Sequence, residues 1–156
     1  MDTKYTKDMT VGRATALLAS LVAEVPQRLL KVDEAKSQEE PRGMTWSRRQ
    51  LLGHLIDSAS NNHQRFVRGQ FQAQMSFPPY AQDDWIAVQG YAERPWVELV
   101  ELWSAYNLHL LHVMRRVPAA AYGHGCVVSA GEGSTLAELM VDYVGHLSHH
   151  LEQILA

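Results

Sequence analysis

Apolar residues recur along this chain at the three-to-four-residue spacing that is typical of amphipathic α-helices. Four segments show this spacing: residues 10–26, 47–72, 95–117 and 135–156. No segment alternates apolar and polar residues over the length of a β-strand. The pattern predicts an all-α fold in which four main helices pack as one bundle, with a single domain over residues 1–156.

Residues with known roles at helix ends support three of these boundaries. Ser47 with Gln50, and Thr135 with Glu138, each fit a capping box, in which both side chains bond to backbone N–H groups of the first turn. Pro95 suits the first turn of the third helix, where its missing N–H is not needed. The second, third and fourth helices therefore have defined starts.

Long connections join the helices over residues 31–44, 73–94 and 119–134. The second connection is long for a loop in a compact domain. It can cross the bundle from end to end, which would let the third helix run parallel to the second. Its aromatic residues either cover a pocket or hold the loop against the bundle, and the sequence leaves both interpretations open.

Two histidines in the fourth helix indicate a metal site. His146 and His150 are four residues apart, so their imidazoles lie on one face of the helix. Two imidazoles cannot fill a tetrahedral coordination shell, so a third ligand must come from elsewhere. If the second and fourth helices are antiparallel, His54 lies level with this pair, about 10 Å from the same end of the bundle. The spacing predicts a site made of His54, His146 and His150.

The ligand set limits which metal is expected. Neutral imidazoles with open coordination positions suit zinc or nickel best, then iron, and not calcium or magnesium. A zinc-protease helix would need Glu directly after His146, where Leu147 stands. A di-iron bundle would need Glu three residues before a histidine, and no histidine here has one.

Composition and charge exclude several other functions. The net charge is −3, and the basic residues are scattered, with Arg48–Arg49 and Arg115–Arg116 as isolated pairs, so no basic surface for nucleic acid or anionic membrane is expected. Cys126 is the only cysteine, which excludes an intrachain disulfide. No apolar run approaches the ~20 residues of a membrane span, and no signal-peptide core is present. We expect a soluble, cytoplasmic protein.

Residues between Trp46 and Ile154 match the pattern of a known family. They are Trp46-Ser47, His54-Leu55-Ile56-Asp57-Ser58, Asn62, Arg65-Phe66, Pro79-Tyr80, Asp84-Trp85, Tyr143, His146, His149, His150 and Ile154. Through them the chain resembles the DinB/YfiT-like superfamily, in the branch with the bacillithiol transferases and metal-dependent hydrolases. The resemblance implies a four-helix bundle with long crossover loops and a three-histidine metal site at His54, His146 and His150. Relatives often carry a further histidine where this chain has Gln153.

The resemblance also implies a function. It favours a metal-dependent enzyme that adds a low-molecular-weight thiol of the bacillithiol type to an electrophilic small molecule, or a related hydrolase. On this hypothesis Asn61 and Arg65 help to bind an anionic thiol or substrate, while Asp57 and Gln153 orient the imidazoles. The alternative is a metal-binding stress-response bundle without turnover. The aromatic helices favour a homodimer.

Overall fold

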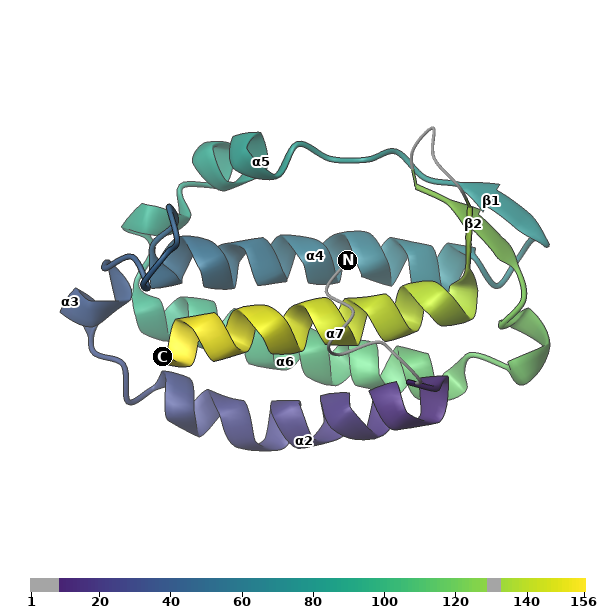
Figure 1. Cartoon of the computed structure of the whole chain (residues 1–156), viewed down its shortest axis with the longest axis horizontal. Helices are drawn as coiled ribbons and strands as arrows, with labels where there is room; N and C mark the ends of the chain where they lie inside the picture. Colours follow the sequence, from purple (N-terminus) through teal and green to yellow (C-terminus); the bar gives the residue numbers. More distant parts are fainter. Residues whose placement is uncertain (1–8, 129–132) are drawn as a thin grey trace.

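The computed structural model describes residues 9–128 and 133–156, and four long helices form its bundle (Figure 1). The helices are α2 (Val11–Leu29), α4 (Arg48–Arg68), α6 (Trp96–Arg116) and α7 (Leu136–Leu155). The predicted four-helix bundle is confirmed. None of the described helices is long and apolar enough to cross a membrane.

The direction of the helices determines which of them can share a site. In Figure 1, α4 and α6 run in one direction, whereas α2 and α7 run in the other. Both α2 and α4 pack against α6 and α7. Because α4 and α6 are parallel neighbours, the chain must return along the bundle between them, as predicted for residues 73–94. α4 and α7 are antiparallel neighbours, the arrangement on which the predicted histidine site depends.

The connections contain short elements that the sequence pattern did not predict. They are α3 (Glu34–Ser37), β1 (Gln74–Ser76), α5 (Gln82–Gln89), η1 (Tyr91–Glu93), η2 (Ala119–Ala121), β2 (Gly125–Val127) and β3 (Ser134–Thr135). β1 pairs with β2 in parallel, and β2 pairs with β3 in the antiparallel sense. Each strand has two or three residues, too few to show alternation in a sequence. Residues 129–132 of the expected loop over 119–134 lie outside the described residues.

α4 begins and ends at specific contacts. The Ser47 N–H donates to Gln50 Oε1 at 2.9 Å, and the Gln50 N–H donates to Ser47 Oγ at 3.3 Å, so the predicted capping box is formed. The helix ends at Arg68, before the expected end at residue 72. At Gly69 a Cβ would lie 3.2 Å from Leu136 and 3.3 Å from the Cys126 sulfur, so the small residue lets the start of α7 and β2 pack closely here.

Arg48, at the start of α4, is 5% exposed and reaches the end of α7. Its Nε donates to the carbonyl oxygen of Ile154 at 3.1 Å, one of the last carbonyls of that helix. A cation at this position is also favoured by the negative end of the helix dipole. The contact fixes how far α7 extends along α4, and therefore the level of its histidines relative to His54.

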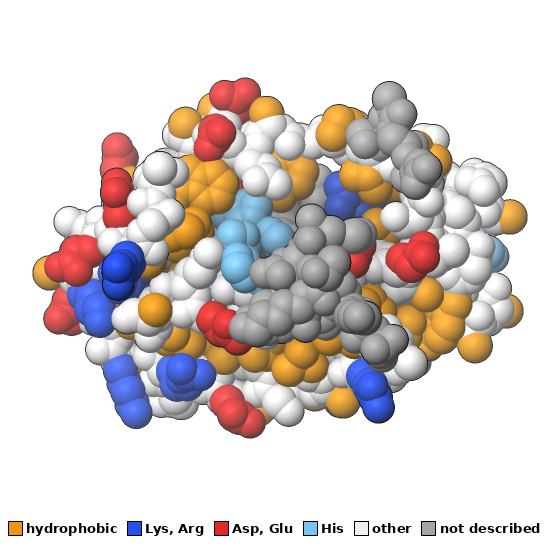
Figure 2. Space-filling model, viewed as in Figure 1, with side chains coloured by type: hydrophobic (Ala, Val, Ile, Leu, Met, Phe, Trp, Pro, Cys, Tyr) orange, Lys and Arg blue, Asp and Glu red, His pale blue; other side chains and the backbone are white. Residues whose placement is uncertain are grey.

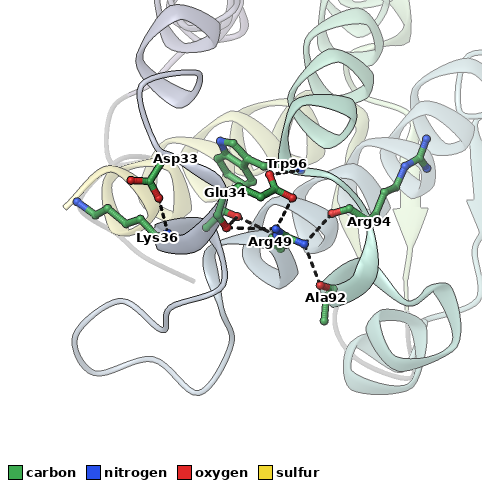
Figure 3. Close-up of polar contacts among 8 residues, drawn as sticks. Asp33, Glu34, Lys36, Arg49, Ala92, Arg94 and Trp96 are labelled. Atoms are coloured by element: carbon green, nitrogen blue, oxygen red, sulfur yellow. Dashed lines mark hydrogen bonds and ion pairs between the residues drawn. The ribbon is translucent and has the colours of Figure 1, made fainter.

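Arg49 is 3% exposed and joins three parts of the chain (Figure 3). Its Nη1 donates to the carbonyl oxygens of Ala92 and Arg94, each at 3.1 Å. Its Nη2 donates to the Glu34 carboxylate at 2.5 Å, and that carboxylate also accepts the backbone N–H of Trp96 at 3.1 Å. Because α3 and η1 cover the N-terminal end of α4, Arg48 and Arg49 are buried and do not contribute to a basic surface.

Replacing Arg49 by alanine should lower the free energy of unfolding by about 3 kcal/mol, because one change leaves a carboxylate and several carbonyl groups without their donor. Urea unfolding followed by circular dichroism measures this loss. Arg116→Ala is the matched control, since Arg116 is exposed and should contribute less than about 0.5 kcal/mol. Equal stability of the two variants would contradict the role assigned to Arg49.

Candidate metal centre

The structure brings together the three histidines that the sequence singled out. His54 comes from α4, and His146 and His150 come from successive turns of α7. The Nε2 atoms of His54 and His146 are 3.0 Å apart, and one ring nitrogen from each of the three residues lies within 4.8 Å of the others. Figure 2 shows histidine side chains reaching the surface in the middle of this face. His54 is 1% exposed, whereas His146 and His150 are half-buried, so the cluster reaches the surface through the two histidines of α7.

Burial keeps the three imidazoles neutral. Desolvation, followed by the charge of His150, lowers the pKa of His54 to about 4. Desolvation and then the neighbouring histidines lower the pKa of His146 to about 3. The pKa of His150 is also lowered, mainly by burial. Neutral imidazoles have the free lone pair that metal coordination requires.

The donor set fits a metal ion of the zinc, nickel or iron(II) class. Two nitrogens bound at about 2.0–2.1 Å to one tetrahedral zinc ion lie about 3.3–3.4 Å apart, so the His54 and His146 Nε2 atoms, at 3.0 Å, would need to separate by only a few tenths of an ångström. The described residues offer no hydrogen-bond partner to His54 Nδ1, so the contact with His146 is the polar contact of this ring. A hydrogen bond between two neutral imidazoles uses one Nε2 lone pair, whereas a metal ion between the rings would accept both.

Gln153 lies where an orienting residue is needed. The Nδ1–H of His150 donates to Gln153 Oε1 at 2.7 Å, and this leaves His150 Nε2 free to face the other two rings. The amide nitrogen of Gln153 in turn lies 3.1 Å from His149 Nε2. The Trp46 ring packs on His54 with a centroid distance of 5.2 Å. Both contacts restrict the rotation of imidazoles in the cluster.

Among the described residues, the Asp57 carboxylate bonds to the crossover and not to a histidine, the partner expected for it. Its Oδ1 accepts hydrogen bonds from the Tyr91 hydroxyl and from Gln89 Nε2, each at 2.7 Å. The Tyr91 ring packs directly on Gly53, where a Cβ would lie 2.2 Å from the ring. Burial raises the pKa of Asp57, and the two hydrogen bonds oppose that shift. Asp57 therefore fastens the crossover between α4 and α6 to the helix that carries His54.

A cavity of about 460 Å³ extends from the histidine cluster along α4 and α7. Its lining residues are Ser58, Asn62, Arg65, Pro79, Tyr80, Gln82, Cys126, Val128, Ser134, Leu139, Asp142, Tyr143 and His146. Two predicted binding residues have different positions here. Arg65 lines the cavity and donates from Nη1 to Asn62 Oδ1 at 3.3 Å. Asn61 does not line it, because its amide bonds to the Asp57 carbonyl and Asn62 occupies the position facing the cavity.

Comparisons with known proteins agree with this architecture. A family model described as the DinB superfamily matches residues 8–154. YfiT from Bacillus subtilis, described as a probable metal-dependent hydrolase with an unusual four-helix bundle topology, has a TM-score of 0.80 at 20% identity, over 95% of this chain and 87% of that one. The mycothiol-dependent maleylpyruvate isomerase has a TM-score of 0.78 at 16% identity, over 97% of this chain and 63% of the isomerase. No curated protein matches. At such identities the structural likeness establishes the fold alone.

Protein incubated with zinc and dialysed should retain close to one equivalent of metal, and His54→Ala should lose it, because two imidazoles on one helix leave the coordination shell half empty. Elemental mass spectrometry on untagged protein measures the content. His112→Ala, which alters an exposed histidine of α6, should retain the metal. Zinc-free wild-type protein would show that the cluster is not a metal site.

The metal-free protein should lose stability as the pH falls from 7 to 4. Unfolded histidines bind protons below a pKa of about 6.5, whereas His54 and His146 bind them only near about 4 and about 3. The unfolded state therefore holds more protons in this window, and each histidine lowers the free energy of unfolding by up to about 1.4 kcal/mol per pH unit.

Urea unfolding in EDTA at several pH values measures this slope. His146→Gln should make it shallower, because one histidine that resists protonation has been removed. His112→Gln should leave it unchanged. A slope that is the same in all three proteins would contradict the assignment.

Proposed function

The chain belongs to the DinB superfamily, and from that premise we propose that it is a metal-dependent enzyme that transfers a low-molecular-weight thiol to an electrophilic small molecule. One observation carries the proposal: three neutral imidazoles lie close together, and one of them, that of His146, lines a cavity that also contains Arg65. A purely structural metal site would be closed by a fourth protein ligand. Here, in the described part of the chain, the cluster contains three.

Residues in different parts of the cavity would have different tasks, the histidines holding a metal ion and Arg65 binding an anionic group. A divalent ion held by His54, His146 and His150 would lower the pKa of a thiol and so supply a nucleophile near neutral pH. Arg65 would bind the anionic part of the thiol or of its partner. Burial, followed by the charge of Asp57, raises the pKa of Tyr80 to about 12, so its hydroxyl keeps its proton and can donate to a ligand. Pro79, Val128 and Leu139 provide apolar wall that excludes water.

Two relatives support different versions of this proposal. The isomerase is described as mycothiol-dependent, which favours a thiol as cosubstrate here. YfiT is described as a probable metal-dependent hydrolase, which favours water in the place of the thiol. We favour the thiol because the cavity is large enough for a ligand beyond water and carries a cation for it. The cytoplasmic location and the homodimer remain predictions from the sequence.

A screen of zinc-loaded and nickel-loaded protein against thiols paired with epoxides or chlorodinitrobenzene tests the activity. We expect a rate above that of free metal, lost in His54→Ala. The same preparation assayed with ester and amide substrates, without thiol, tests the hydrolase. Metal-loaded protein that is inactive in every pairing would leave the metal-binding stress-response bundle as the better interpretation.

Arg65→Ala should weaken the binding of anionic thiols by about tenfold or more, since a charge-assisted hydrogen bond contributes about 1.5–3 kcal/mol. Metal content should not change, because Arg65 does not contact the three histidines. Titration calorimetry and elemental analysis of the same sample give both quantities. Loss of metal from Arg65→Ala would mean that the residue supports the fold of the site instead of binding a ligand.

A further inference from the structure

A second pair of histidines lies between α4 and α6, away from the three-histidine cluster of His54, His146 and His150. His63 of α4 and His109 of α6 have ring centroids 5.0 Å apart, and their ring planes are at 82° to each other. In the cluster, the ring of His54 is 4.9 Å from that of His146 and 5.1 Å from that of His150, at 78° and 86°. The rings of the second pair are therefore as close, and as steeply inclined, as those of the candidate metal centre.

The second pair is separate from the cluster. His63 follows His54 by nine residues, which is two and a half turns of α4, so the two side chains leave opposite sides of the helix, about 14 Å apart along its axis. His54 faces α7, whereas His63 faces α6. His63 is half-buried and His109 is exposed, so dissolved ions can reach the pair.

The Tyr106 hydroxyl is placed to orient the His63 ring. His63 Nδ1 lies 3.3 Å from the hydroxyl oxygen, and the two ring planes are at 89° to each other. With its proton on Nδ1, His63 donates to this oxygen and keeps a lone pair on Nε2, which is the tautomer that a metal ion selects. Burial, followed by the charge of His109, lowers the pKa of His63 and so keeps this ring neutral near pH 7.

We propose that His63 and His109 form a second metal site, for a divalent ion such as zinc that prefers imidazole ligands. His63 would bind the ion through Nε2 and His109 through one ring nitrogen, with water completing the coordination shell. Two protein ligands hold an ion less tightly than three, so this site would exchange its ion with solvent under conditions in which the cluster retains its own. The ion would also join α4 to α6. The inference is independent of the proposed function, because neither histidine belongs to the cluster.

His112 lies near the pair but is not placed as a third ligand. Its ring centroid is 6.4 Å from that of His109, and the two ring planes differ by 26°. A metal ion lies close to the plane of each imidazole that binds it, so two separated and nearly parallel rings do not converge on one ion. Because His112 is exposed and lies three residues after His109 on the same helix, it provides the matched control.

Equilibrium dialysis against buffered zinc, together with long-range proton–nitrogen NMR of the histidine rings, tests the site. Wild-type protein should take up zinc at the pair more weakly than at the cluster, and the resonance of His63 Nε2 and that of one His109 nitrogen should shift as it binds. His63→Gln and His109→Gln should each weaken this binding by about a hundredfold or more, because a single imidazole remains. Tyr106→Phe should weaken it by about tenfold, through loss of the orienting hydroxyl.

Two further variants serve as controls. His112→Gln should bind zinc at the pair as the wild-type protein does. His54→Ala, which alters the cluster, should leave the zinc-induced shifts of His63 and His109 in place. Circular dichroism checks that each variant is folded. Since His109 is exposed, His109→Gln tests the site even if the half-buried His63 does not tolerate replacement.

Zinc-induced shifts that spare His63 and His109 would overturn the inference, and so would equal weakening in His109→Gln and His112→Gln. A loss of only half of the weak zinc uptake in His63→Gln and in His109→Gln would also overturn it, since this is the behaviour of single imidazoles that bind independently. These results would leave the proposed function standing, because that function depends on the cluster.

Discussion

The rest of the structure depends on the burial of a polar stripe on α4, which includes His54, Asp57 and Ser58. These three residues are between 1% and 5% exposed, although each carries polar side-chain atoms. Buried polar groups destabilise a fold unless they find partners. The partners come from different elements: His146 from α7 bonds to His54, and Tyr91 from the crossover bonds to Asp57. The stripe thus determines which parts of the chain must pack against α4 and at what level.

The bundle topology supplies those partners in a consistent way. Since α4 and α6 are parallel, the crossover lies along the full length of α4 (Figure 1). Pairing of β1 with β2 holds it at one end, and the contact of Tyr91 with Gly53 and Asp57 holds it at the other. Its middle then forms a wall of the cavity through Pro79 and Tyr80. The aromatic residues of this segment therefore serve both interpretations that the sequence left open.

The sequence predicted the features that repeat or that follow from a fixed spacing. Helical periodicity identified the four helices, and the four-residue spacing of His146 and His150 identified the face on which His54 was sought. The sequence did not predict the features that depend on contacts between distant parts of the chain. Nothing in the local pattern distinguishes Asn62 from Asn61, or shows that Asp57 bonds to Tyr91 instead of a histidine. In the sequence, Arg48 and Arg49 cannot be distinguished from surface residues. They are buried because they bind carbonyl groups of Ile154 and Ala92, which are distant in the chain.

The separation of the histidines along the chain has a consequence for how the protein is made. His54 and His146 are 92 residues apart, and α7 follows all of the other elements. At ribosomal rates of about 5–20 residues per second, on the order of ten seconds pass between their synthesis. During this interval α4 exposes the imidazole of His54, which is buried in the folded protein, without α7 to cover it. The three-histidine cluster therefore cannot form until α7 has been synthesised and has packed against α4.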